Sequence, residues 1–246
     1  MKTLVAIPVY NEVKHIHQVL EEVRKYSSDI LTINDGSSDG SRDVLHQEKD
    51  LHVIHHSRNL GYGAALRSAF GFAQAHDYDV LVTMDSDGQH EAERIPVLLE
   101  ALRNDIDMVS GSRYLRVFKE NTAPPVERRR INSLLTTYLN QKLGLNLTDA
   151  FCGFKAYRVK QLRKFQITEN GYGMPLQLWV QAANLGLRIT EVAVPLVYLD
   201  ANRTFGGGLD DAAKRLAYYQ SVIEGELERI HLGQPTETTI TEGLAV

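Results

Sequence analysis

Residues 80–90 read VLVTMDSDGQH, an apolar run that stops at two aspartates separated by one residue. A short apolar run that is rich in β-branched residues and bounded by a polar turn is typical of a buried strand. Strands buried on both faces belong to parallel sheets, in which ligands bind beyond the carboxyl ends of the strands. The segment therefore predicts a central strand with a polar site at its end.

The segments on either side repeat the alternation of strand and helix. Short apolar runs alternate with helix-period patterns, the runs at 4–9, 30–34, 51–55 and 108–110 and the patterns at 16–23, 62–76 and 95–103. Strands that alternate with helices of this length predict right-handed crossovers. The expected fold class is α/β, with a mostly parallel central sheet flanked by helices.

The rhythm changes after residue 113. Residues 114–127 form a polar loop that contains Pro124 and Pro125, which exclude a regular helix. Farther along we expect helices at 128–143, 175–185 and 210–230 and strands at 154–157 and 189–197. We expect one domain over residues 1–230 and a disordered tail over 231–246, because the tail carries four threonines and lacks an apolar period.

The bulk composition excludes several classes of protein. Hydrophobic residues make up 43% of the 246-residue chain and charged residues 24%, the balance of an ordinary globular protein. A net charge of −4 gives no overall positive field for nucleic acid, and no apolar stretch reaches the ~18 residues of a membrane span. The single cysteine, Cys152, excludes an internal disulfide and fits a reducing compartment. We expect a cytoplasmic protein, soluble or peripheral at the cytoplasmic membrane face, with no nucleic-acid partner.

Acidic residues follow three of the expected strands. Glu12 follows the first strand, Asp35 the second, and Asp85 and Asp87 the strand quoted above. Two carboxylates two residues apart repel each other unless a cation compensates, and Mg²⁺ or Mn²⁺ suits such hard oxygen ligands. An Asp-rich surface turn is the alternative for an isolated pair. The convergence of three acidic strand ends favours a metal that neutralises a diphosphate leaving group.

The turn after the second expected strand, residues 34–40 (NDGSSDG), allows two interpretations. Asp35 could accept hydrogen bonds from a nucleobase, or it could cap the following helix. Asp39 or Ser38 could provide that cap instead. We favour the nucleotide interpretation for Asp35 and leave both open for Asp39.

Several segments carry a resemblance to a known family. Four of them resemble the inverting family-2 glycosyltransferases of GT-A fold: 7–12 (IPVYNE), 34–40 (NDGSSDG), 58–65 (RNLGYGAA) and 84–90 (MDSDGQH). Residues 111–114 (GSRY) and 149–155 (DAFCGFK) are similar to segments of the dolichyl-phosphate mannosyltransferase-like branch. The resemblance covers about residues 3–208 and implies the GT-A fold.

The resemblance also implies ligands for the acidic rim. It implies a nucleoside pocket lined by Pro8, Tyr10, Glu12 and Asp35. Asp85 would bridge ribose or metal, and Asp87 with Gln89 would ligate the metal between the donor phosphates. Tyr10 and Pro8 offer an apolar wall for a base, and Gln89 adds a neutral oxygen ligand. His90 is left out, because a lone histidine beside a turn is more often solvated.

Arginines in the second half supply positive charge. Arg113 ends the fifth expected strand, and Arg203 precedes a glycine-rich segment. Arg129 and Ser133 lie at i and i+4, on one face of a helix. Guanidinium groups suit phosphate oxygens, and the resemblance implies that these positions hold the donor diphosphate and the phosphate of a lipid acceptor. A solvated helix start is the alternative for residues 128–130.

By the same resemblance Asp149 lies near the reacting sugar, and we count it with Asp87 and Arg113 as catalytic. An alcohol acceptor needs a general base, whereas a phosphate acceptor is already an anion, so Asp149 is either a base or a sugar ligand. The chain departs from the family pattern at two positions, with Asn34 where Asp is frequent and Gln177 where Glu is frequent. If residue 177 contacts substrate, an unusual acceptor or sugar preference follows.

We expect a metal-dependent inverting glycosyltransferase that moves a sugar from a UDP- or GDP-sugar to an acceptor, with Mg²⁺ or Mn²⁺ as cofactor. By resemblance the acceptor is a polyprenyl (dolichyl-type) phosphate, reached by peripheral docking or through a membrane partner. Residues 115–119 (LRVFK) could dock in this way or form a lid. The alternatives are a small soluble acceptor and a non-catalytic sugar-nucleotide-binding protein. A nucleotidyltransferase usually has a glycine-rich basic loop after its first strand, which residues 8–12 lack.

Overall fold

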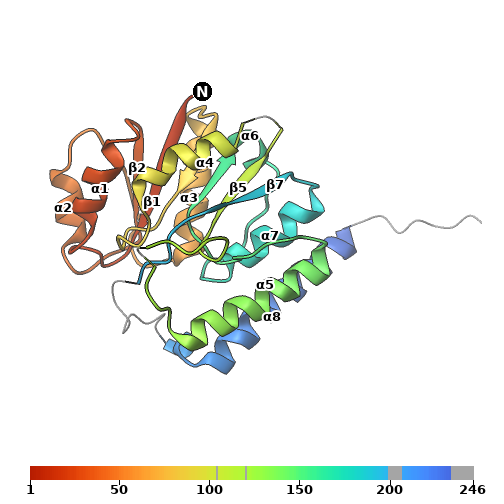
Figure 1. Ribbon diagram of the computed structural model, residues 1–246. Coiled ribbons are helices and arrows are strands. Elements are labelled where there is room, and N and C mark those ends of the chain that lie inside the picture. The colour runs from red at the N-terminus through yellow and green to blue at the C-terminus, as the bar shows by residue number, and fades with distance from the viewer. Residues whose placement is uncertain (104, 120, 199–206, 234–246) are drawn as a thin grey trace, which may run out of the picture.

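The computed structural model describes residues 1–103, 105–119, 121–198 and 207–233, and a β-sheet lies at their centre (Figure 1). Within this part of the chain the sheet has seven strands, in the order β3-β2-β1-β4-β6-β5-β7. They are β1 (Thr3–Val9), β2 (Ile30–Asn34), β3 (His52–His55), β4 (Val80–Thr83), β5 (Met108–Ser112), β6 (Lys155–Arg158) and β7 (Ile189–Ala193). Each strand expected from the sequence is present.

The sheet is mostly parallel, as predicted. β1 pairs in parallel with β2 and β4, β2 pairs in parallel with β3, and β5 pairs in parallel with β7. β6 lies between β4 and β5 and runs antiparallel to both. It therefore joins two parallel groups of strands into one sheet.

Helices cover both faces of this sheet. They are α1 (Ile16–Arg24), α2 (Ser41–Gln47), α3 (Tyr62–Ala75), α4 (Ile95–Ala101), α5 (Val126–Leu143), α6 (Val159–Leu162), α7 (Met174–Asn184) and α8 (Ala212–Gly233), with short 3₁₀ turns at Ala92–Arg94 and Gly207–Asp210. Helix α2 had no periodic signal in the sequence, because it is short and buries only Ser41 and Leu45.

Alternate residues of β1 enter two different cores. Leu4 and Ala6 are buried with side chains of α3, α5, α7 and α8. Val5 and Ile7 are buried with side chains of α1, α2 and α4 on the other face. This period of two is the pleat of a strand, and it produces three layers in which the sheet separates two sets of helices.

Helices α5 and α8 contact each other and lie side by side at the lower edge of Figure 1. The helix expected at 128–143 begins at Val126, directly after the two prolines. Helix α8 extends to Gly233, so the first three residues of the expected tail, 231–233, are helical, and 234–246 lie outside the described residues. No helix in the described ranges is both long and apolar enough to cross a bilayer.

The register of the parallel strands places three loops at one edge of the sheet. Val9, the last residue of β1, is in register with Asn34, the last residue of β2, and β4 runs in the same direction on the other side of β1. The turn after β2 packs closely on residues 58–59. A Cβ added to Gly36, whose φ is +68°, would lie 2.2 Å from the carbonyl carbon of Arg58.

Candidate active site

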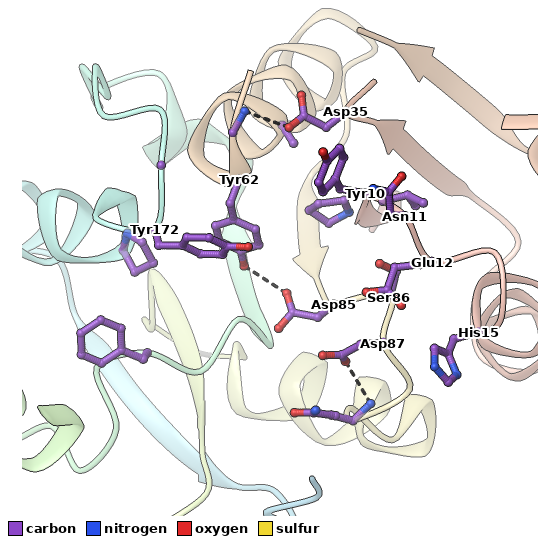
Figure 2. A pocket seen from close by; sticks show the side chains of 18 of the residues that line it. Tyr10, Asn11, Glu12, His15, Asp35, Tyr62, Asp85, Ser86, Asp87 and Tyr172 are labelled. Atoms are coloured by element: carbon purple, nitrogen blue, oxygen red, sulfur yellow. Dashed lines mark hydrogen bonds between the residues drawn. The ribbon is translucent and has the colours of Figure 1, made fainter. Parts of the chain in front are cut away.

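A cavity of about 820 Å³ lies where the loops after β1, β2, β4 and β5 meet helices α3, α5 and α8. Eight of the residues singled out in the sequence line it: Pro8, Tyr10, Glu12, Asp35, Asp85, Asp87, Gln89 and Arg113. Figure 2 shows the acidic side chains from three strand ends around this one space. The cavity is large enough for a nucleotide-sized ligand.

Three residues fix the position of Asp85. The Tyr62 hydroxyl donates a hydrogen bond of 3.1 Å to its Oδ1 atom (Figure 2), and burial together with the Asp85 charge raises the pKa of Tyr62 well above its usual value. The backbone N–H of Asp85 donates to His90 Nδ1 at 3.0 Å. A Cβ added to Gly153 would lie 2.6 Å from Asp85 Oδ1, so only glycine permits this approach.

Asp87 and Gln89 stand on the same turn. Asp87 Oδ1 accepts the backbone N–H of Gln89 at 3.1 Å (Figure 2), which orients the carboxylate along the cavity wall. Among the described residues no group of three or more His, Cys, Asp or Glu side chains is arranged to hold a metal. A cation at this turn would have two carboxylates and an amide oxygen from the chain, and Mg²⁺ commonly takes its other ligands from water and substrate phosphates. The donor set therefore fits a hard divalent cation.

The end of the cavity near β1 and β2 combines apolar and acidic groups. Tyr10 is 46% exposed and lines this end with Pro8, while Glu12 is buried. Asp35 Oδ1 accepts from Leu60 N–H at 2.9 Å, and Asp35 Oδ2 accepts from Gly61 N–H at 2.8 Å. Asp35 thus fixes the turn before α3 and also faces the cavity.

Asp39 precedes Gly40, the N-cap residue of α2, and binds the first residue of that helix. Its Oδ1 atom accepts the backbone N–H of Ser41 at 2.9 Å, at the start of α2, and its Oδ2 atom accepts Val13 N–H at 2.9 Å. Partial burial would raise the pKa of Asp39, but the hydrogen bonds from Ser41 and Val13 outweigh it and lower that pKa. Asp39 joins the loops after β1 and β2 and lines the cavity.

Arg113 and Asp149 form a bidentate ion pair at the end of β5. Arg113 Nε lies 2.6 Å from Asp149 Oδ2 and Arg113 Nη2 lies 2.9 Å from Oδ1, while Asn132 Nδ2 donates to Oδ1 at 2.8 Å. Burial would raise the pKa of Asp149, but the Arg113 charge and these hydrogen bonds lower it to about 2. Arg113 lines the cavity and Asp149 is fully buried behind it, so Asp149 does not line the cavity itself and acts on it through its bonded partners, Arg113 and Asn132.

Helix α5 brings different residues to the cavity from those singled out. Arg129 and Ser133 are exposed and do not line it, whereas Arg128 and Asn132 do. Ile131 and Leu135 turn inward, and this fixes the rotation of the helix so that the face of 129 and 133 is directed to solvent. Arg203 lies outside the described residues.

Several other residues of the cavity were not singled out from the sequence. Arg215 of α8 is buried and lines the cavity. Tyr172, Tyr219 and Phe151 also line it. The rings of Tyr62 and Tyr172 stack with centroids 5.9 Å apart, and together they form one wall in Figure 2. Arg215, Tyr172, Tyr219 and Phe151 all lie in the second half of the chain. An aromatic residue there is as typical of a hydrophobic core as of a ligand site.

His90 and Gln177 differ from the sequence interpretation. The His90 imidazole is only 6% exposed and stacks on Phe154, so it is a buried partner of Asp85 and not a solvated side chain. Gln177 is buried away from the cavity, where its Nε2 donates to Glu226 Oε2 at 2.8 Å. Its departure from the family pattern therefore concerns the contact between α7 and α8.

Comparisons with known proteins agree with this geometry. The model of the Glycosyl transferase family 2 matches residues 4–165. An undecaprenyl-phosphate mannosyltransferase of Micrococcus luteus is 34% identical over 244 residues, covering 95% of this chain and 100% of that protein. A polyprenol monophosphomannose synthase of Mycolicibacterium smegmatis is 30% identical over 240 residues, covering 93% of this chain and 89% of that protein.

Solved structures share the fold. Glucosyl-3-phosphoglycerate synthase from Mycobacterium tuberculosis in complex with UDP has a TM-score of 0.72 at 19% identity, covering 92% of this chain and 80% of that one. The same enzyme is known with Mn²⁺, UDP and glucosyl-3-phosphoglycerate, at a TM-score of 0.70. The fold is therefore GT-A, and the chain belongs to the Glycosyl transferase family 2 and is a glycosyltransferase.

Proposed function

We propose that this enzyme transfers a sugar from a UDP- or GDP-sugar to a polyprenyl phosphate, with inversion at the anomeric carbon. The names of the M. luteus and M. smegmatis relatives support a polyprenyl acceptor, since both match nearly the whole chain. Mannose, which both names mention, is the first sugar to test.

One observation carries this proposal: carboxylates and arginines from different elements face a single cavity at the carboxyl edge of the sheet. Asp85 and Asp87 follow β4, whereas Arg113, Arg128 and Arg215 come from β5, α5 and α8. A donor diphosphate with a cation suits the acidic turn, and an acceptor phosphate suits the arginines. Two anionic substrates thus find separate partners within one space.

A divalent cation would be held by Asp85, Asp87 and Gln89. When bound, it would neutralise the charge that develops on the leaving diphosphate. The chain's own contribution is to keep the two carboxylates in place, through Tyr62 and Gly153 around Asp85 and through the Gln89 N–H on Asp87. Pro8 and Tyr10 would form an apolar wall for the nucleobase.

The transfer needs no general base if the acceptor is a phosphate. A phosphate oxygen forms the new bond to the anomeric carbon while the bond from that carbon to the donor diphosphate breaks, and the nucleoside diphosphate leaves with the electron pair. Arg113 would stabilise anionic oxygens on one side. Asp149 would act by fixing that guanidinium, because its pKa of about 2 leaves it a very weak base.

The test is turnover with a defined acceptor. The protein is incubated with Mn²⁺, a panel of UDP- and GDP-sugars, and short-chain polyprenyl phosphate in detergent, and free nucleoside diphosphate and glycosylated lipid are quantified together. The proposal predicts equal amounts of both with one donor. A parallel panel offers 3-phosphoglycerate and other soluble acceptors. The soluble-acceptor alternative is favoured if one of these is glycosylated while nucleoside diphosphate forms without glycolipid. No product with any donor would contradict catalysis.

A matched pair of variants tests the arginines. Arg128→Gln removes a cavity arginine and is expected to raise the KM for polyprenyl phosphate about tenfold or more, the effect of losing one charge-assisted hydrogen bond. Arg163→Gln removes an exposed arginine outside the cavity and should leave KM unchanged. Equal KM values for the two variants would remove Arg128 from the acceptor site.

A further inference from the structure

Three tyrosines from different elements line the cavity. They are Tyr62 of α3, Tyr172 of the loop before α7 and Tyr219 of α8, and we call them the tyrosine row. The rings of Tyr62 and Tyr172 are nearly parallel, at an angle of 17° with centroids 5.9 Å apart. Tyr219 is only 3% exposed and Tyr62 is half-buried, whereas Tyr172 is 37% exposed. Tyr172 is therefore the member of the row that is most open to a ligand.

One end of the tyrosine row lies at the acidic turn. The Tyr62 hydroxyl donates a hydrogen bond to Asp85 Oδ1 at 3.1 Å. Figure 2 shows Tyr62 with Tyr172 on one side of Asp85, and Tyr10 with Asn11 on the other. The tyrosine row is thus a separate surface from the wall that we propose for the nucleobase.

The other end of the row lies at the arginines. Arg215 and Tyr219 are four residues apart in α8, so they share one face of that helix. Burial raises the pKa of Tyr219 to about 12, the charges of Arg215 and Arg128 oppose this rise, and the Tyr172 hydroxyl adds to it. Tyr219 is therefore close to Tyr172 and to both arginines. The row leads from the carboxylates at one end to the arginines at the other.

The loop that carries Tyr172 is fixed against two helices. A Cβ added to Gly61, the N-cap residue of α3, would lie 2.4 Å from the carbonyl oxygen of Asn170, so the loop packs directly on the start of α3. On the other side the Tyr218 hydroxyl of α8 donates to Glu169 Oε1 at 2.6 Å. Tyr172 is thus held in place before a ligand binds, which lowers the entropic cost of binding.

The transferred sugar has to lie between the two groups of charges. In the proposed reaction its anomeric carbon is bonded first to the donor diphosphate and then to the acceptor phosphate. A pyranose ring exposes C–H groups on its faces, and their partial positive charge suits the negative face of an aromatic ring. We propose that the ring of Tyr172 binds the hexopyranose of the donor. This inference rests on the proposed function.

The test compares the affinity for a nucleoside diphosphate with the affinity for the matching sugar nucleotide. GDP with GDP-mannose, and UDP with UDP-glucose, are titrated calorimetrically in the presence of Mn²⁺ and without acceptor. Tyr172→Ala is expected to weaken the binding of the sugar nucleotide about threefold to tenfold, while the affinity for the nucleoside diphosphate stays unchanged. Tyr172→Phe keeps the ring and should retain the wild-type ratio of the two affinities.

Tyr26→Ala is the matched control, because Tyr26 is 39% exposed and lies outside the cavity. It should keep the wild-type ratio, and thermal unfolding of each variant shows whether the fold is intact. An unchanged ratio in Tyr172→Ala would overturn the proposal, and so would an equal change in Tyr26→Ala. Equal weakening of the nucleoside diphosphate and the sugar nucleotide would also overturn it, because the substitution would then act on Asp85 through Tyr62.

Turnover separates this inference from the proposed function. Tyr172→Ala should lower kcat/KM for the donor and leave the KM for polyprenyl phosphate unchanged. A raised KM for polyprenyl phosphate with an unchanged ratio of donor affinities would assign Tyr172 to the acceptor and refute the sugar contact. If the wild type forms no glycolipid, the proposed function fails, while the ratio of affinities still tests the sugar contact. A wild type that binds none of the four nucleotides would contradict both.

Discussion

At the scale of single residues, the site depends on how closely the backbone approaches Asp85. Gly153 has no Cβ, and this lets Asp85 Oδ1 and the Tyr62 hydroxyl occupy positions 2.6 and 2.8 Å from where a Cβ would be. These distances are far inside van der Waals contact. The position of the Asp85 carboxylate therefore depends on a residue that does not itself line the cavity.

Gly153→Ala is expected to displace Asp85 and to weaken donor binding at least about tenfold, because a methyl group takes the place of the carboxylate. The matched control is Gly71→Ala in α3, where an added Cβ meets nothing within 4 Å; it should leave donor affinity unchanged and stabilise the fold slightly. Calorimetric titration with UDP and GDP measures both. Unchanged affinity in Gly153→Ala would mean that Asp85 is not positioned in this way.

The ion pair of Arg113 and Asp149 should make folding stability depend on pH. The pKa of Asp149 is lowered from 3.8 to about 2 in the folded protein. The stabilisation is fully present above pH about 4 and is lost as pH falls toward 2, since the unfolded state binds the proton first. Asp149→Asn should remove this part of the dependence and lower the free energy of unfolding by about 3 kcal/mol at pH 6.

Urea unfolding of the wild type and Asp149→Asn at pH 6, 4 and 2.5 measures this effect. The difference between the two proteins should shrink steadily as the pH falls. A constant difference over this range would show that Asp149 keeps its ordinary pKa and that Arg113 does not stabilise its anion.

At the scale of elements, a buried polar network joins α7 to α8. Gln177 Oε1 accepts the backbone N–H groups of Thr168 and Glu169, both at 2.9 Å, while its Nε2 atom donates to Glu226. Gln181 Nε2 donates to the other oxygen of Glu226 at 2.8 Å. Gln177 thus donates one of the hydrogen bonds that Glu226 accepts, beside those from Gln181 and Arg229.

Gln177→Glu should destabilise the protein by about 2 kcal/mol or more at pH 7, because it replaces a hydrogen bond with two facing carboxylates. The penalty should fall at acidic pH, where one carboxyl is protonated and donates again. Gln141→Glu makes the same change on the exposed side of α5 and should cost little. Thermal unfolding at pH 7 and pH 5 distinguishes them, and similar midpoints at pH 7 would contradict the role of the network.

Most elements of the fold could be predicted from the sequence. The strands and most helices follow from short apolar runs and helical periods, and the parallel strand ends place Glu12, Asp35 and Asp85 around one cavity. The rotation of α5 was harder to predict. Arg128 and Arg129 differ by one residue, and only the tertiary packing of Ile131 and Leu135 decides which of them faces the cavity.

Other features depend on contacts that no local pattern contains. The antiparallel insertion of β6 between β4 and β5 depends on pairing between residues far apart in sequence, such as Val80 with Arg158. The sequence predicts a solvated His90, but Phe154 stacks on its ring and the backbone N–H of Asp85 donates to its Nδ1. Arg215 comes from α8, far from any quoted motif.

At the scale of the whole molecule, the net charge of −4 conceals a separation of charge. The sheet's β1, β2 and β4 loops present carboxylates to the cavity, whereas β5, α5 and α8 present arginines. The proposal of two anionic substrates rests on this arrangement, and it makes the acidic side dependent on a cation. The dependence on a cation is the central claim.

Calorimetric titration of UDP and GDP into the wild type and Asp87→Asn, each with Mn²⁺ and with EDTA, tests that claim most directly. Asp77→Asn, at a 90% exposed aspartate outside the cavity, is the control. We predict that the wild type and Asp77→Asn bind one of the two nucleotides at least about tenfold more tightly with Mn²⁺ than with EDTA. Asp87→Asn should lose this difference and keep the unfolding temperature of the wild type. Equal affinity in Mn²⁺ and EDTA for the wild type, or an undiminished effect of Mn²⁺ in Asp87→Asn, would contradict it.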